Sequence, residues 1–239
     1  RTTYVDYASL KTTYVVRLGG AKDGSNFPIY YSNNSGSSWT AFASKPSGSP
    51  YQGHVGVSAD GAAVLWCPEG SSTTYRTTNN GTSWTTCSNL NYTTRPVGDQ
   101  VIANKMYAYN PNSGYLYVST DKGASFTQAG NAGSGGFVKI RTVPGIEGNI
   151  WIALNGGGLT RSTNSGSTFN KLSNVSSCGA VGFGKTATGS THPTVFIWGI
   201  ANGGTEGIYR STDAGATWTR VNDDSHEFGG PANGQFIVG

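Results

Sequence analysis

Residues 179–186 read Gly-Ala-Val-Gly-Phe-Gly-Lys-Thr and match the phosphate-binding loop of ATP- and GTP-binding proteins. That loop requires a helix directly after its Lys-Thr pair, because N–H groups at the helix N-terminus bind the phosphates. Here Lys185-Thr186 is followed by Gly189 and Pro193, which disfavour a helix. The dinucleotide-binding glycine pattern in the same stretch fails for the same reason. We therefore expect an inner β-strand here and no nucleotide cofactor.

Other reactive patterns are also weak. The sequence has no Gly-x-Ser-x-Gly elbow, and His54, His192 and His226 are too sparse for a metal cluster. The turns that contain Asp or Asn lack the terminal Glu of a calcium loop, so no metal site is predicted. A glycosidase needs two carboxyl groups that face each other across a cleft. The carboxylates without an evident turn role are Asp6, Asp23, Asp99, Glu147, Glu206, Asp223, Asp224 and Glu227.

Five segments align without gaps and share one turn motif: Ser or Thr, any residue, Asp or Asn, any residue, Gly, two residues, then Trp or Phe. They begin at Ser32, Thr77, Ser119, Ser162 and Ser211, so successive starts lie 45, 42, 43 and 49 residues apart. Such a period is typical of a β-propeller with one four-stranded blade per repeat. The defining residues are Asn34, Gly36, Trp39, Asn79, Gly81, Trp84, Asp121, Gly123, Phe126, Asn164, Gly166, Phe169, Asp213, Gly215 and Trp218.

The turn motif has a structural explanation. A short Asp or Asn side chain bonds nearby backbone N–H groups, and the Gly two places later accepts a positive φ. We expect an all-β fold, a β-propeller of four-stranded antiparallel blades, over residues 1–239 as a single, partial domain. Blades are expected near residues 1–48, 51–90, 95–131, 136–174 and 179–222, with a loop and the first strand of a sixth blade in 223–239.

Composition limits the partners. The net charge is +4, but the sixteen Lys and Arg residues are scattered, so nucleic acid is not an expected partner. No apolar run of about 18 residues predicts a membrane span, and Arg1 does not open a signal peptide. Asn-x-Ser/Thr triplets at Asn33, Asn80, Asn91 and Asn174 are compatible with secretion. We expect an extracellular protein in which Cys67 and Cys87, which flank one hairpin, can form a disulfide.

The repeated turns resemble the Asp-box, which sialidases, sortilin-like receptors and several plant-polysaccharide enzymes share. Residues 5–20, 57–66, 139–169, 182–187 and 197–230, in this order, are similar to glycoside hydrolase family 74. The family consists of xyloglucan-specific endoglucanases and related reducing-end-specific enzymes. The resemblance implies two seven-bladed propellers that enclose a cleft. It also implies hydrolysis with inversion of the anomeric configuration, catalysed by two aspartates, one from each propeller. The chain resembles most of the second propeller, and neither catalytic aspartate has a matching position in it.

The resemblance leaves substrate binding as the expected contribution of this chain. Xyloglucan is neutral, with C–H faces that stack on aromatic rings and hydroxyls that need polar partners. The useful face of the propeller is the one opposite the turn motifs. The loops 155–158 and 202–206 are expected on that face. The candidate substrate-binding residues are His226, Trp198, Trp151, Lys139, Arg141 and Asp223.

Three functions stay open from the sequence. The first is a secreted xyloglucan hydrolase acting on a β-1,4-glucan backbone, whose remaining propeller domain is a partner of this chain. The second is a lectin-like propeller that binds carbohydrate without catalysis, since four to eight blades can close a ring. The third is a receptor-type interaction propeller, which only the turn motifs favour.

Overall fold

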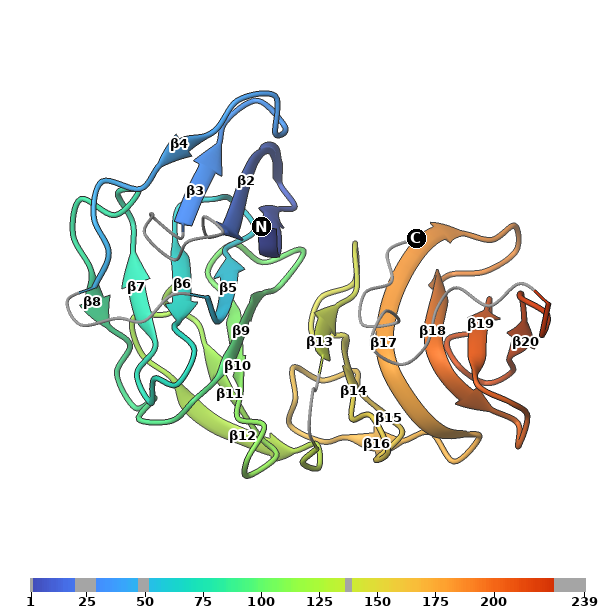
Figure 1. Ribbon diagram of the computed structural model, residues 1–239. Helices are drawn as coiled ribbons and strands as arrows, with labels where there is room; N and C mark the ends of the chain where they lie inside the picture. Colours follow the sequence, from blue (N-terminus) through green and yellow to red (C-terminus); the bar gives the residue numbers. More distant parts are fainter. Residues whose placement is uncertain (1, 20–28, 47–51, 136–138, 226–239) are drawn as a thin grey trace. The chain divides into compact units, whose positions relative to one another are not determined.

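The computed structural model describes residues 2–19, 29–46, 52–135 and 139–225 (Figure 1). Within these ranges the strands form five four-stranded sheets, and no helix is present. The strands of every sheet follow one another in chain order, with antiparallel pairing. This is the construction of a propeller blade. The predicted all-β class and the blade architecture are therefore confirmed.

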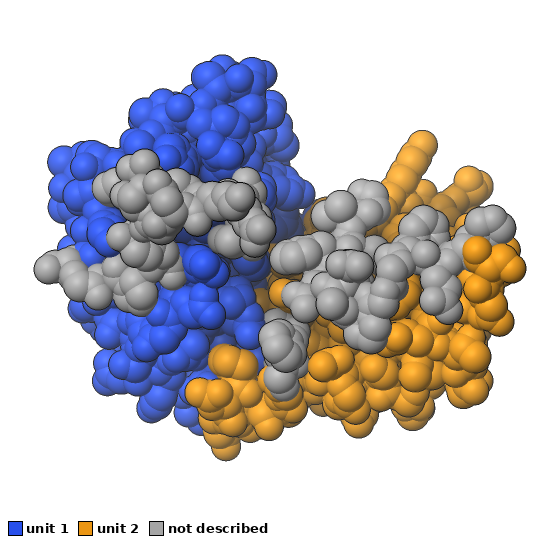
Figure 2. Space-filling model, in the orientation of Figure 1, with its two compact units in different colours: residues 1–110, 116–129, 145–147 blue, residues 111–115, 130–144, 148–239 orange. Residues whose placement is uncertain are grey.

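Two compact units divide the chain (Figure 2). One contains residues 1–110, 116–129 and 145–147, and the other contains residues 111–115, 130–144 and 148–239. The first unit holds the β1–β4 and β5–β8 sheets and most of the β9–β12 sheet. The second holds the β13–β16 and β17–β20 sheets. Among the described residues, no helix has the length and apolar character that a membrane crossing requires.

The strands of the first three sheets are β1 (Thr2–Ala8), β2 (Lys11–Gly19), β3 (Ile29–Ser32), β4 (Thr40–Ala41), β5 (His54–Val57), β6 (Val64–Cys67), β7 (Tyr75–Thr77), β8 (Thr85–Thr86), β9 (Arg95–Gly98), β10 (Met106–Tyr109), β11 (Tyr115–Ser119) and β12 (Thr127–Asn131). Those of the last two are β13 (Lys139–Thr142), β14 (Ile150–Ala153), β15 (Leu159–Ser162), β16 (Asn170–Lys171), β17 (Val175–Thr186), β18 (Pro193–Ala201), β19 (Gly207–Ser211) and β20 (Thr219–Arg220).

The turn motif joins the third and fourth strands of each sheet and has one hydrogen-bond pattern. In the first motif the Ser32 hydroxyl donates to Asn34 Oδ1 at 2.8 Å and accepts from the Gly36 N–H at 2.9 Å. Asn34 Oδ1 also accepts from the Ser38 N–H at 2.9 Å. The pattern recurs in the other four motifs. The Gly and the residue before it both have positive φ, for example 56° at Ser35 and 86° at Gly36.

Apolar side chains between neighbouring sheets form the core of the first unit. One cluster joins Val16, Leu18 and Phe42 of the first sheet region to Val55 and Trp66 of the second sheet. A second cluster joins the second sheet to the third, and its members are Leu65, Cys87, Leu90, Met106, Ala108, Tyr117 and Phe126. Each sheet in this unit is therefore held mainly by burial of its faces against its neighbours.

Two predictions about single segments have clear outcomes. Gly179, Lys185 and Thr186 all lie in β17, so this segment forms the predicted strand and not a phosphate-binding loop. The three cysteines are buried free thiols, so the expected Cys67–Cys87 disulfide is absent from the structure. The Cys67 sulfur instead accepts a hydrogen bond from the Thr94 N–H at 3.3 Å.

Candidate functional site

Every sheet has two distinct ends. At one end, here called the loop end, the first strand begins and the second strand connects to the third. The turn motif lies at the opposite end, because consecutive antiparallel strands reverse direction. The loops 154–158 and 202–206 connect second to third strands and therefore lie at the loop ends of their sheets. These are the segments that the sequence placed on the substrate-binding face.

Trp151 is a core residue, which corrects the expectation that it contacts a ligand. Its side chain on β14 is fully buried, with Nε1 donating to Asn149 Oδ1 at 3.1 Å. The Arg161 guanidinium lies over one side of the ring, 5.0 Å from its centroid, and the Phe183 ring packs edge-on. Trp198 on β18 is also in the core, with 7% of its surface exposed. A ring buried in this way has no face on which a sugar can stack.

Lys139 and Arg141 lie on the same face of β13 and are half-buried, alternating with the buried Ile140 and Thr142. Lys139 is the first residue of the strand, so it lies at the loop end. The Arg141 guanidinium donates to the carbonyl of Ile140 at 3.2 Å. Their position on an inner strand is compatible with ligand binding, which stays a prediction for both.

Asp223 and Asp224 follow β20, also at a loop end. Asp223 Oδ1 accepts a hydrogen bond from the Ser225 N–H at 2.9 Å, which stabilises a local turn. Asp224 forms an ion pair with Arg220 at 2.7 Å, and this contact raises the pKa of the Arg220 guanidinium. His226 lies outside the described residues. A contact between Asp223 and a ligand is therefore still a prediction.

Four carboxylates of the first unit have structural partners. Asp6 Oδ2 accepts from the Val57 N–H at 2.8 Å and so joins β1 to β5. Asp99 is buried and accepts from the Tyr107 hydroxyl at 2.8 Å, while Glu147 pairs with Lys105. The Asp60 carboxylate pairs with Lys122, which helps to hold its pKa below the usual range. These contacts explain the four carboxylates without any catalytic role.

Two polar residues at the loop end of the first unit were not singled out from the sequence. His54 and Arg95 are the first residues of β5 and β9, the inner strands of consecutive sheets. The Arg95 guanidinium contacts Nε2 of His54. Because arginine can only donate, Nε2 is the acceptor in this contact. The Tyr4 ring of β1 packs edge-on against His54, with centroids 5.3 Å apart.

Arg95 is half-buried, and burial changes the pKa of its guanidinium and of a neighbouring tyrosine. Burial lowers the pKa of its guanidinium, and its buried Nε has no hydrogen-bond partner among the described residues. Burial also raises the pKa of Tyr109, which pairs with Arg95 across the strands, to about 12. Arg95 and His54 thus place hydrogen-bonding groups beside a tyrosine ring, an arrangement suited to a hydroxylated ligand. In the sequence, the signal that could have identified these residues is the polar residue that begins each of three inner strands (His54, Arg95 and Lys139).

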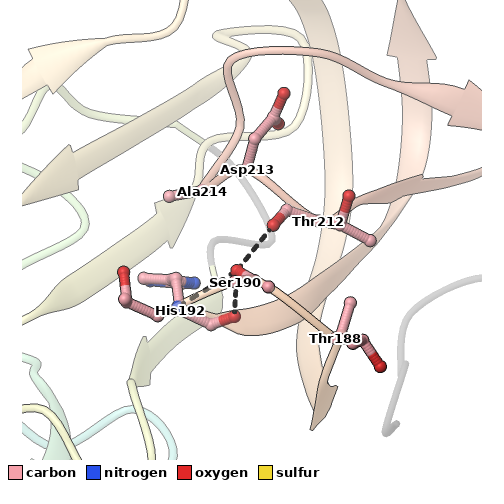
Figure 3. A pocket seen from close by; sticks show the side chains of 9 residues that line it. Thr188, Ser190, His192, Thr212, Asp213 and Ala214 are labelled. Carbon is pink, nitrogen blue, oxygen red and sulfur yellow. Dashed lines mark hydrogen bonds between the residues drawn. The ribbon is translucent and has the colours of Figure 1, made fainter.

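A hollow of about 410 Å³ lies at the opposite end of the last sheet (Figure 3). It is lined by residues 187–192 of the β17–β18 loop and by 212–214 of the last turn motif. The Ser190 hydroxyl contacts the carbonyls of Thr212 at 2.8 Å and His192 at 3.0 Å and so connects the two segments. Asp213 is the one carboxylate that lines the hollow, and Ser211 and Thr217 donate to it. A glycosidase needs two carboxyl groups, whereas this hollow has one, which is already hydrogen-bonded within the turn motif. The hollow is therefore not a hydrolytic site.

No family model matches the chain. Similarity to known proteins nevertheless covers almost its whole length. It is 36% identical over 237 residues to a xyloglucanase from a Paenibacillus species, and 40% identical over 228 residues to a xyloglucanase from Acetivibrio thermocellus. Each match covers 95% of this chain but only 23% and 27% of the respective relative.

Solved structures give the same result. The crystal structure of a glycoside hydrolase family 74 enzyme from Niastella koreensis matches with a TM-score of 0.88 and 45% identity, covering 99% of this chain and 33% of that one. The family 74 xyloglucanase from Xanthomonas campestris matches with a TM-score of 0.86 and 33% identity, covering 94% and 32%. The chain spans between about a quarter and a third of the length of these relatives. Over almost its whole length the chain is therefore similar, in sequence and in fold, to enzymes of glycoside hydrolase family 74.

Proposed function

We propose that this chain belongs to a xyloglucan-degrading glycoside hydrolase and supplies part of the surface that binds the polysaccharide. The observation that carries the proposal is similarity over 95% of the chain to proteins named xyloglucanases. The family resemblance further suggests an inverting reaction on the β-1,4-glucan backbone, with one aspartate from each of two propellers. Because neither aspartate has a matching position here, one would come from the rest of this propeller and the other from the remaining propeller domain.

The loop end of the first unit supports a role in binding. Xyloglucan has no charge, so affinity must come from hydrogen bonds to its hydroxyls and from contact with its C–H faces. Arg95 is half-buried at this end, and its guanidinium contacts His54 beside it. Such groups are held in place before the ligand arrives, which reduces the entropy lost on binding. Lys139 occupies the same position on β13 in the second unit.

We also propose that the protein acts outside the cell, where its polymeric substrate occurs. Two of the four Asn-x-Ser/Thr triplets start with exposed residues, Asn33 and Asn91. The Asn174 amide instead donates to the carbonyls of Gly215 and Ala216, and the Asn80 oxygen accepts from Tyr14, so both are engaged in the fold. Mass spectrometry of protein exported by a glycosylating host should find sugar on Asn33 or Asn91 and not on Asn174.

The proposal is tested by incubating the purified chain with xyloglucan and analysing products by mass spectrometry, beside affinity electrophoresis in gels that contain the polymer. We expect retardation of the chain in the gel without release of oligosaccharides. A full-length family 74 enzyme is the positive control for release. Release by the chain alone would show that both catalytic groups lie within it, and absence of retardation would contradict a role in binding.

A further inference from the structure

An asparagine that precedes a glycine can modify itself, because glycine has no side chain to keep other atoms away from its backbone nitrogen. This nitrogen attacks Cγ of the asparagine, a new N–C bond forms, and the Cγ–Nδ2 bond breaks, so that ammonia leaves with the proton of the glycine N–H. Water then opens the cyclic imide at either carbonyl and leaves aspartate or isoaspartate. The chain contains four such pairs, at positions 80–81, 155–156, 202–203 and 233–234.

The backbone conformation of the asparagine does not distinguish the three pairs that the structure describes. Asn80, Asn155 and Asn202 all lie in the left-handed region, with φ of 50°, 55° and 54°. The fourth asparagine, Asn233, lies outside the described residues. The reaction needs a side-chain amide that can turn and a glycine N–H that is not hydrogen-bonded. Any difference in rate among the three should therefore come from the contacts of these two groups.

Asn80 is restrained at both groups. Its Oδ1 accepts a hydrogen bond from the Tyr14 hydroxyl at 2.7 Å, and the Gly81 N–H donates to Thr77 Oγ1 at 3.0 Å. Gly81 is buried in the second turn motif, where a Cβ would lie 2.9 Å from the Ser44 carbonyl oxygen. The Asn80 amide can reach the Gly81 nitrogen only after both hydrogen bonds break.

Asn202 is restrained at one group. Its Nδ2 donates to the carbonyl of Trp218 at 3.0 Å, which holds the side-chain amide in place. The Gly203 N–H has no hydrogen-bond partner within the described ranges, and a Cβ on Gly203 would meet no atom there within 4 Å. One hydrogen bond therefore separates Asn202 from the reactive arrangement.

Asn155 has neither restraint. Its side chain is exposed at the loop end of the fourth sheet and makes no hydrogen bond to any described residue. The Gly156 N–H is likewise without a partner in the described part of the chain, and a Cβ on Gly156 would meet no atom there within 4 Å. The φ of Gly156 is not positive, so its conformation does not require a glycine. Both reacting groups are thus available in the folded state.

We propose that Asn155 and Gly156 form a self-modification site, at which the folded protein converts asparagine into aspartate and isoaspartate. The Asn155 N–H donates to the carbonyl of Cys178 at 2.7 Å, and the Cys178 N–H donates back at 2.9 Å, so Asn155 joins the fourth sheet to β17 of the fifth. Isoaspartate adds one carbon to the main chain beside this bridge, and both products add a negative charge at the loop end. The inference is independent of the proposed function.

The test follows the conversion of amide to acid at each pair by mass spectrometry of tryptic peptides. The three described pairs fall on different peptides, which are residues 77–105, 142–161 and 186–210. The purified chain is incubated folded in mildly alkaline buffer, and a second sample is incubated in guanidinium chloride, which removes the restraints of the fold. Two variants are treated in the same way. Gly156→Val shields the attacking nitrogen and keeps Asn155, and Tyr14→Phe removes one of the two restraints on Asn80.

In the folded chain we expect Asn155 to convert about fivefold faster than Asn202 and about 25-fold faster than Asn80, because one and two hydrogen bonds respectively have to break first. In guanidinium chloride the three rates should become alike. Gly156→Val should slow the conversion of Asn155 and leave the other two rates unchanged. Tyr14→Phe should speed the conversion of Asn80 about fivefold and leave Asn155 unchanged.

Two results would overturn the proposal. Equal rates at Asn155 and Asn202 in the folded chain would show that side-chain contacts do not select the site. Conversion of Asn155 in guanidinium chloride only would show that its backbone bridge to Cys178 holds the residue away from the reaction in the folded state.

Discussion

Arg95 is half-buried at the loop end of β9, and its side chain is our strongest candidate for donating to a sugar hydroxyl. Replacing it by alanine should weaken xyloglucan binding about tenfold or more, since a hydrogen bond from a charged donor contributes about 1.5–3 kcal/mol. Arg210→Ala, at an exposed position on β19, is the matched control. Affinity electrophoresis measures both, with the Tm confirming that each variant is folded. Equal affinity of Arg95→Ala and wild type would remove Arg95 from the binding surface.

His192 makes the fold sensitive to acid. The side chain is 6% exposed, its Nδ1 contacts the carbonyl of Pro193 at 2.7 Å, and its Nε2 has no hydrogen-bond partner in the described part of the chain. Burial lowers its pKa below the unfolded value of 6.5, and the nearby Arg161 charge lowers it further. The unfolded chain therefore binds a proton more readily than the folded chain. Stability should be fully present above pH 6.5 and decrease as the pH falls from there towards the folded pKa.

The slope of the unfolding free energy against pH measures the effect of His192 protonation. Each pH unit in that window should cost up to about 1.4 kcal/mol of unfolding free energy. Urea unfolding between about pH 5 and 7 should show the slope in the wild type and a flatter profile in His192→Gln. The carboxylates in the turn motifs do not interfere, since Asp121 has a pKa of about 2 and titrates well below the window. A His192→Gln profile as steep as the wild type would assign the slope to another group.

The turn motif depends on a glycine at its fifth position for two reasons that can be separated. Gly123 has φ +82°, and a Cβ there would lie 2.6 Å from a Leu65 methyl group of the neighbouring sheet. Gly145 has a similar φ of +75°, but a Cβ there would meet no atom within 4 Å. Gly145→Ala should therefore cost about 1 kcal/mol for backbone strain alone, and Gly123→Ala about 2–4 kcal/mol with the added overlap. Chemical denaturation measures both, and equal costs would show that the contact between sheets adds nothing.

The difference between local and long-range contacts explains which features the sequence could predict. The five turn motifs are local, since Ser or Thr, Asp or Asn and Gly contact one another within five residues, so their spacing revealed the blades. Trp151 was misassigned because strand alternation separates two faces but does not tell which neighbour covers each one. The contact between His54 and Arg95 joins two sheets across 41 positions of the chain, and no local pattern encodes it.

At the scale of the whole molecule, the fold should not depend on disulfides. All three cysteines are buried free thiols, and burial raises the pKa of Cys87 to about 12, which keeps it protonated and unreactive. A native disulfide contributes about 2–5 kcal/mol, which would shift the Tm of a domain of this size by about 4 °C or more. We expect a reducing agent to change the Tm by less than about 1 °C. Thiol titration after unfolding in denaturant should detect all three cysteines, even in protein exported through an oxidising compartment. Detection of one thiol, together with a lower Tm on reduction, would restore the Cys67–Cys87 pairing that the sequence suggested.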